Sequence, residues 1–156
     1  MKIIFSILCG LLLTSCPNKN MNDNQETKEI VHLFEGNLLG AGEEGLKKEN
    51  FIISSEKEWK EFLNKINRIN KVSSKFEPSV NFSTDMVLIA IEEVKTTGGF
   101  GIKVAELEEE KEKINVIVER IGPKPTDMVI MVITQPINIV KIKKTNKEII
   151  FVEKSK

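Results

Sequence analysis

Residues 85–102, DMVLIAIEEVKTTGGFGI, contain an apolar run and an alternating segment that are separated by a cluster of glycines. The unbroken run Met86–Ile91 is typical of a β-strand that is buried on both faces. Apolar residues then alternate with others over residues 100–104, which is the period of a second strand. Glycine can take a positive φ or let another backbone approach closely. We therefore expect a sharp turn at Gly98 and Gly99, with a positive φ or no room for a Cβ at one of them at least.

The sequence before this stretch predicts one helix. Ser55 and Glu58 fit a capping box, the side-chain pattern that satisfies N–H donors at the start of a helix. Apolar residues follow at helical spacing over residues 56–69, and this stripe includes Trp59. We expect the stripe to pack on the sheet rather than to bind a partner, because amphipathic helices usually bury their apolar face in their own domain.

Short strands and loops surround the helix and the glycine cluster. Strands are expected at 30–34, 51–53, 85–94, 100–107, 114–118, 137–142 and 149–152. Residues 128–133, MVIMVI, form a second continuous apolar run, and Pro136 follows it. Glycines predict a loop over 36–45, and the charges at 108–113 predict a solvated hairpin tip. The pattern predicts an α+β fold: a mainly antiparallel sheet, partly open barrel or sandwich-like, with one amphipathic helix packed on it.

The N-terminus reads as a cellular address. Lys2 is followed by a short apolar run, too short to span a bilayer and typical of a secretory signal peptide. The run ends in Leu-Thr-Ser-Cys at residues 13–16, which resembles the lipobox of bacterial lipoproteins. That resemblance implies cleavage before Cys16, lipidation of Cys16, and anchoring to a bacterial membrane in the cell envelope, facing outside the cytoplasm. The predicted organisation is a signal peptide at 1–15, a lipidated cysteine with a disordered tether at 16–28, and a single domain at 29–156.

Two motifs further along the chain carry a second resemblance. Thr97-Gly98-Gly99-Phe100 closes one strand, and Thr134-Gln135-Pro136 opens a later one. This order, over about residues 51–144, resembles the PrcB C-terminal domain, a family named for a subunit of a bacterial protease complex. Phe100 stands where the family usually has tyrosine, and Ile137 where it often has an aromatic residue. The resemblance implies a lipoprotein accessory or interaction module without established catalytic residues.

The residue types argue against several classes of function. Lys plus Arg equals Asp plus Glu at 23 each, so no excess positive charge points to nucleic acid. His32 is the single histidine, and both cysteines lie at or before Cys16, so no catalytic triad and no zinc site are expected after it. Gly98–Gly101 leads into a strand and not into a helix, so a dinucleotide-binding loop is not expected. We expect no cofactor, no metal and no enzymatic activity.

Two functions from different classes remain after these exclusions. The first is a lipid-anchored, non-enzymatic module that binds or stabilises a partner protein, with a protease as the leading candidate. The second is an extracytoplasmic carrier of a small ligand or peptide, with a site near the Gly98–Gly101 turn. Gly98, Gly99, Phe100, Thr134 and Pro136 are the candidate binding residues, and loops such as 122–127 are the expected partner surface. An enzyme that uses carboxylates alone ranks last.

Overall fold

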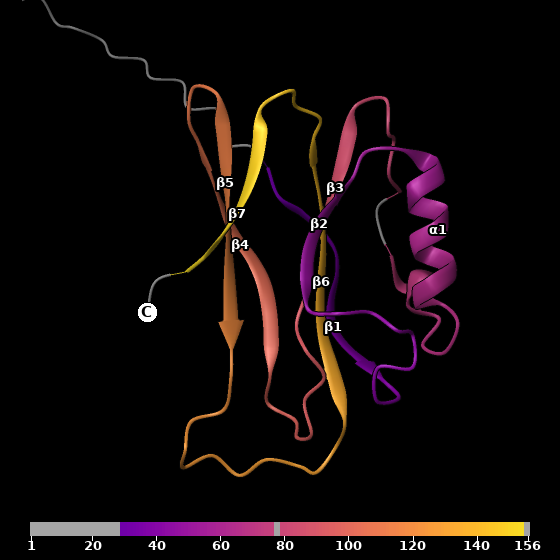
Figure 1. The fold of residues 1–156 in the computed structure, drawn as a ribbon, viewed down its shortest axis with the longest axis vertical. Helices are drawn as coiled ribbons and strands as arrows, with labels where there is room; N and C mark the ends of the chain where they lie inside the picture. Colours follow the sequence, from indigo (N-terminus) through magenta and orange to yellow (C-terminus); the bar gives the residue numbers. More distant parts are fainter. Residues whose placement is uncertain (1–28, 77–78, 155–156) are drawn as a thin grey trace, which may run out of the picture.

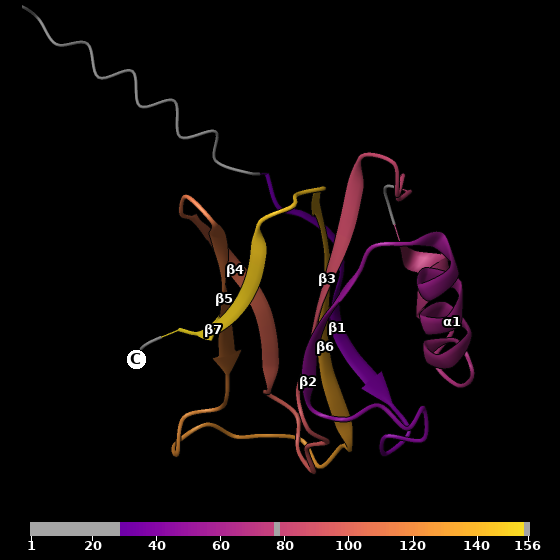
Figure 2. The ribbon, with the colours of Figure 1, turned by 45° about the horizontal axis from the view of Figure 1, so that its top comes forward.

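The computed structural model describes residues 29–76 and 79–154, which form three layers (Figures 1 and 2). The predicted signal peptide, Cys16 and the predicted tether lie outside the described residues. The elements are β1 (Val31–Leu39), β2 (Glu49–Ile53), α1 (Glu56–Ile66), the short 3-10 helix η1 (Val72–Lys75), β3 (Asp85–Ile91), β4 (Gly101–Glu109), β5 (Lys113–Ile121), β6 (Thr134–Lys143) and β7 (Glu148–Glu153).

Seven strands of the described chain form two sheets packed as a sandwich, with the helix on the outer side of one of them. Sheet A has the order β1-β6-β3-β2, and every neighbouring pair in it is antiparallel. Sheet B has the order β4-β5-β7, with β4 and β5 antiparallel and β5 and β7 parallel. The predicted α+β class with mainly antiparallel pairing is confirmed, and the sheets form an open sandwich.

The apolar run Met86–Ile91 lies in β3, an inner strand of sheet A. Every residue of β3 is buried. Val87, Ile89 and Ile91 face the core between sheet A and α1. Met86, Leu88 and Ala90 face the core between the two sheets. Because successive side chains of a strand point to opposite faces, a strand between two cores must be apolar at every position.

The helix begins as predicted and ends earlier than predicted. The Ser55 side chain accepts a hydrogen bond from the Glu58 N–H, and the Glu58 carboxylate accepts one from the Ser55 N–H, which completes the capping box. Phe62 and Ile66 are buried in the same core as residues of β3, and Trp59 packs partly buried against that core, so the predicted packing of the stripe on the sheet is confirmed. Ile69 lies beyond the last turn and is 43% exposed.

The first strand is longer than the sequence predicted. Residues 36–39, expected in a glycine loop, continue β1 as far as Leu39. Leu39 lies opposite Thr134 at the start of β6, and Val31 lies opposite Lys141 near its end. The long edge that β6 offers therefore overrides the local preference of Gly36 for a turn.

Candidate partner-binding surface

The glycine turn carries the chain from sheet A to sheet B. Gly99 has a φ of +87°, a conformation that strains any residue with a Cβ. A Cβ on Gly98 would lie 3.0 Å from Cγ1 of Ile130, and the Gly98 N–H donates a hydrogen bond to the Ile130 carbonyl at 3.0 Å. The expected turn is confirmed, with the positive φ at Gly99 and the tight contact at Gly98.

The second predicted motif lies directly beside the chain that leads into this turn. Thr134 and Lys95 exchange two main-chain hydrogen bonds, at 2.7 and 2.9 Å. The Glu92 N–H donates to the Pro136 carbonyl at 2.9 Å. Pro136 is the third residue of β6, in keeping with the predicted place near a strand start. The structure thus brings the Gly-Gly-Phe and Thr-x-Pro motifs together at one end of the domain.

Phe100 is partly buried at this end, but it is not part of either hydrophobic core. The Lys95 ammonium lies 4.9 Å from the centre of its ring, within cation–π range. A Cβ on Gly122 would lie 3.3 Å from the same ring. Phe100 therefore packs between the glycine turn and the loop that follows β5. None of these contacts needs the phenolic hydroxyl of the tyrosine that the family usually has here.

The second apolar run, 128–133, is not a strand in the structure. It is an open stretch of the loop between β5 and β6, without a turn or a bend assigned to it, and it crosses the end of the molecule from sheet B to sheet A (Figure 1). Met128 is fully exposed, Met131 is 84% exposed and Ile130 is 72% exposed. The run lies past the ends of both sheets, where no neighbouring strand remains to pair with it.

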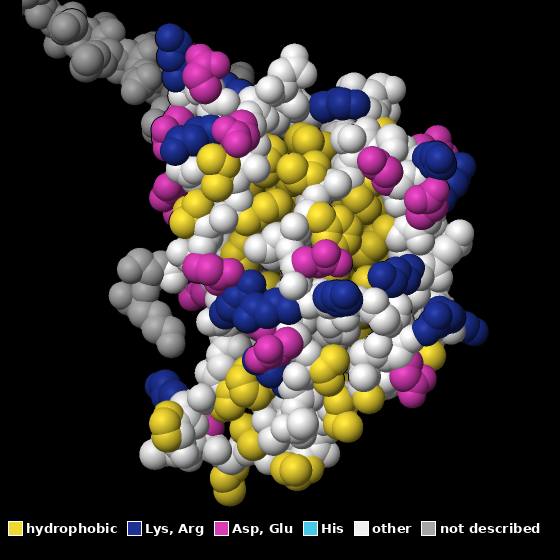
Figure 3. Space-filling model, viewed as in Figure 1, with side chains coloured by type: hydrophobic (Ala, Val, Ile, Leu, Met, Phe, Trp, Pro, Cys, Tyr) yellow, Lys and Arg dark blue, Asp and Glu magenta, His cyan; other side chains and the backbone are white. Residues whose placement is uncertain are grey.

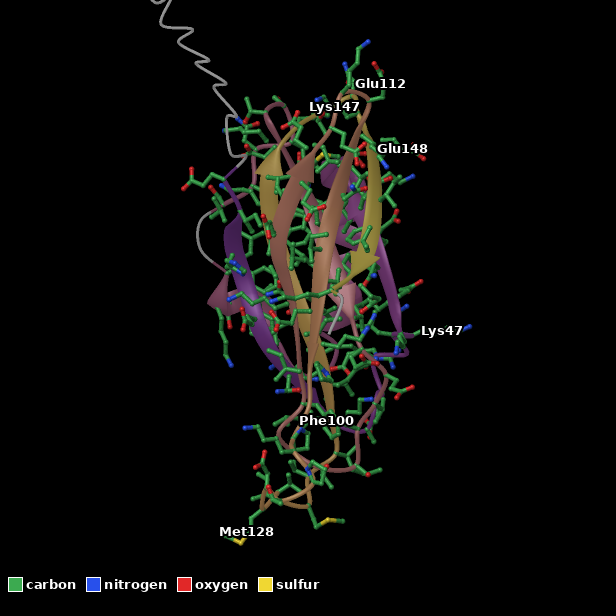
Figure 4. All side chains as sticks on the ribbon, turned by 90° about the vertical axis from the view of Figure 1, so that its left-hand side faces the viewer. Lys47, Phe100, Glu112, Met128, Lys147 and Glu148 are labelled. Carbon is green, nitrogen blue, oxygen red and sulfur yellow. The ribbon has the colours of Figure 1, made fainter. Side chains whose placement is uncertain are left out.

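Hydrophobic exposure is concentrated at this end of the domain. Of the eleven large hydrophobic side chains that are exposed in the described residues, five belong to residues 128–133. Val94, which precedes the Lys95–Thr134 bridge, and Ile121, opposite Gly101, are also exposed and lie at the same end. We call Val94, Ile121 and residues 128–133 the apolar tip. Figure 3 shows hydrophobic side chains at the lower end of the molecule, below a band of charged ones, and Figure 4 shows Met128 projecting there.

We call residues 122–133, the loop between β5 and β6, the tip loop. Local hydrogen bonds fix the base of this loop. The Lys124 N–H donates to the Asp127 carboxylate at 2.8 Å, and the Asp127 N–H donates to the Lys124 carbonyl at 3.0 Å. The loop also packs closely against Gly99. A Cβ added at Gly99 would lie 3.3 Å from Pro123 and 3.5 Å from Val129. The apolar side chains are therefore presented on a loop with a defined base.

A charged clasp between the sheets lies next to the tip and was not predicted. Glu92 follows β3, its side chain is only 4% exposed, and Lys48 lies 3.0 Å from its carboxylate. Arg120, on β5, donates to the same carboxylate and binds Glu153 of β7 with two hydrogen bonds at 2.8 and 2.9 Å. The position of Glu92 directly after an apolar run was the signal in the sequence, since an acid there enters a largely buried environment.

The clasp also fixes the charge state of Glu92. Burial raises the pKa of Glu92, but hydrogen bonds from the Glu93 N–H, Lys48 and Arg120 lower it more, so the net pKa lies below its ordinary value. The clasp lines a pocket of about 490 Å³ that also contains Phe100 and Gly122. Glu92 already pairs with the cations Lys48 and Arg120 in this pocket. The geometry of the clasp therefore favours a link between the sheets over a ligand site.

A catalytic histidine site, a metal site and a membrane-spanning helix are the remaining candidates among the described residues. His32 is exposed on β1, with Nδ1 at 3.8 Å from the Glu35 carboxylate. Across residues 29–76 and 79–154, no three His, Cys, Asp or Glu side chains gather in a way that could hold a metal ion. No helix in that same part of the chain has the length and apolar character needed to cross a membrane.

Part of the chain matches a known family. Residues 86–143 match the family model described as PrcB C-terminal, which confirms the predicted resemblance over a narrower range than expected. The matched range includes nearly all of β3, the glycine turn, the tip loop and β6. No curated protein and no solved structure matches the chain.

Proposed function

We propose that this chain is a lipid-anchored, non-enzymatic accessory module of the bacterial cell envelope, and that its apolar tip binds a partner protein. The observation that supports this proposal is the run of six consecutive apolar residues 128–133, five of them exposed, on a loop with a fixed base. Soluble monomers rarely expose contiguous apolar surface of this kind unless it binds something. The anchor in the proposal is Cys16, and the proposed partner is a protease.

The residue types at the tip suit protein recognition. Met128 and Met131 are the two most exposed side chains of the run, and methionine is flexible and adapts to irregular apolar surfaces. Lys124 and Asp127 are the only charged residues of the loop from 122 to 133, so its formal charges cancel. A protease as partner is what the resemblance to the PrcB C-terminal domain implies, and residues 86–143 match that family model.

The test is copurification from the native envelope. The full-length chain carries a tag, is solubilised with detergent, and its partners are identified by mass spectrometry and then purified for binding measurements. We expect Met131→Asp to weaken the purified complex by about tenfold or more, as is usual when a charge enters the apolar centre of an interface. The melting temperature of the Met131→Asp variant alone should stay at the wild-type value, because Met131 is exposed.

Thr126→Asp is the matched control. It adds the same charge to the same loop but leaves all six apolar side chains of 128–133 in place. We expect this control to bind like the wild type, because the proposal places the partner surface at residues 128–133 and not at 122–127, where the sequence led us to expect it. Equal binding by wild type, Met131→Asp and Thr126→Asp would reject the apolar tip as the binding surface.

A further inference from the structure

We propose, resting on the partner-binding function above, that the tip loop binds as an added β-strand. In the proposed complex the main chain of residues 128–133 pairs with an exposed strand edge of a different protein, at the floor of an apolar groove. The loop would then contribute its hydrogen-bonding groups as well as its side chains.

The main chain of the loop is free to make such bonds. None of the six N–H groups of residues 128–133 donates a hydrogen bond to another described residue. One carbonyl in the run is engaged, that of Ile130, which accepts from the Gly98 N–H at 3.0 Å. Water satisfies the free groups while the loop is exposed, but a partner that covers the apolar side chains must also replace that water.

The residue types of the run are those of a strand. MVIMVI consists of two Val-Ile pairs, each preceded by a methionine, without glycine, proline or charge. Short segments of this composition have high β-propensity and pair readily with an exposed strand edge. The run continues without a break into Thr134, the first residue of β6. A strand formed here would therefore extend β6 beyond the end of sheet A.

The Gly98 contact tells which groups face outward. In an extended chain the N–H and C=O of one residue point to the same side, and those of its neighbours point to the other. Because the Ile130 carbonyl points at Gly98, the main-chain groups of Val129 and Met131 point away from the glycine turn. These two residues are the ones that a partner strand would pair with.

Lipid is a poor occupant for this surface. Hydrocarbon offers no partner for the free N–H groups. The tip also lies at the end opposite to Glu29: β1 starts with Val31 opposite Lys141, whereas the loop leads into Thr134 at the other end of β6. In Figure 4, Phe100 and Met128 lie at one end, and Glu112, Lys147 and Glu148 at the other. The described chain therefore begins at the charged end, away from the tip.

A second copy of the chain is also a poor occupant. A stable interface buries about 800 Å² on each partner. Two projecting loops of six residues would meet only along one edge, and the outer faces of both would stay in water. A groove with a strand edge at its floor encloses the loop on both faces, so both the main chain and the methionine side chains are buried.

The experiment uses the full-length protein in its own envelope. The photoreactive residue benzoylphenylalanine replaces Met131 in one variant and Glu112, at the opposite end, in a control. We expect the photoreactive residue at position 131 to cross-link to one protein that the same residue at position 112 does not reach. That protein is then purified, and its dissociation constant is measured for Met131→Pro and Met131→Ala. The proline removes the outward N–H, whereas the alanine keeps it, and we expect about tenfold weaker binding for the proline variant than for the alanine variant.

Two controls separate this inference from the function on which it rests. Ile130→Pro removes an N–H on the side of the glycine turn and should bind more tightly than Met131→Pro. Wild-type melting temperatures for Met131→Pro and Met131→Ala would exclude misfolding, since the Met131 N–H has no acceptor within the described chain. Equal binding of these two variants, with Met131→Asp still defective, would reject strand pairing and leave the apolar tip as the site. Cross-links from Met131 to lipid or to a second copy would reject the proposed occupant.

Discussion

Gly99 adopts a φ of +87° where the chain passes from one sheet to the other. Its position is also confined, with Pro123 at 3.3 Å and Val129 at 3.5 Å from where a Cβ would be. Gly98 differs, because its φ is not positive and the atom nearest to its Cβ position belongs to the exposed Ile130, which has room to move. The two glycines are therefore needed for different reasons.

We expect Gly99→Val to lower the free energy of unfolding by about 1–3 kcal/mol, the usual cost of backbone strain. Gly98→Val should cost less, since Ile130 can shift. Gly101→Ala is the control, because a Cβ at Gly101 would make only ordinary contacts at 3.6 Å. Chemical denaturation of domain 29–156 gives the three values, and wild-type stability for Gly99→Val would refute a strained turn.

The stability that Glu92 contributes should depend on pH. Its pKa in the folded protein lies below the ordinary value of 4.5, so Glu92 contributes stability at pH values above 4.5. This contribution is lost as the pH falls through the lower, folded-state pKa. We expect Glu92→Gln to cost about 1–3 kcal/mol at pH 7, because charged hydrogen bonds in the clasp are weakened. The difference from wild type should shrink below pH 4.5, and a difference that is constant down to pH 2 would contradict the assignment.

At the scale of elements, α1 covers the outer face of sheet A through aromatic side chains. Trp59 stacks with Phe62 at 5.8 Å and with Phe76 at 5.7 Å between ring centres. Phe82 also lies within reach of the indole, at 6.4 Å. These rings join the helix to the segments that follow it, and the capping box fixes where the helix begins.

We expect Trp59→Ala to destabilise the domain by about 2–3 kcal/mol, less than a fully buried tryptophan costs, because Trp59 is only partly buried. Trp59→Phe should recover most of this loss, since a ring remains to stack. Thermal and chemical unfolding measure both changes. A Trp59→Ala variant as stable as the wild type would show that the stacking adds nothing.

At the scale of the whole molecule, the two ends of the sandwich differ in character. The end beside Glu112 and Lys147 is charged, with Lys147 paired to Glu109 at 2.7 Å, and β1 begins at this end. The other end is the apolar tip. The predicted tether ahead of Glu29 would therefore connect to the charged end of the domain, and the apolar tip lies at the far end.

Cys16→Ala tests the anchor. We expect the full-length variant to lose acylation and to leave the membrane fraction, because the thiol that would carry the lipid is absent. Fractionation of the envelope and mass spectrometry of the N-terminal peptide measure the two effects. Cys9→Ala is the control and should stay membrane-bound. Membrane retention of Cys16→Ala at the wild-type level would reject the anchor.

Local chemistry was enough to predict several elements from the sequence. The pairing of Ser55 with Glu58 fixes the start of α1 within a single turn, so no distant residue is needed to recognise it. The glycine turn is equally local, because the positive φ at Gly99 follows from the freedom of glycine. The resemblance to the PrcB C-terminal domain also came from motifs in the sequence alone, and it is confirmed for residues 86–143.

The tertiary structure decided what the apolar runs become. DMVLIAI and MVIMVI carry nearly the same pattern, yet the first is the buried strand β3 and the second is exposed at the tip. The difference lies in their neighbours, since β3 has β2 and β6 beside it, whereas residues 128–133 lie past the end of both sheets. A strand needs hydrogen-bonding partners from distant parts of the chain, and only the folded arrangement determines where those partners end.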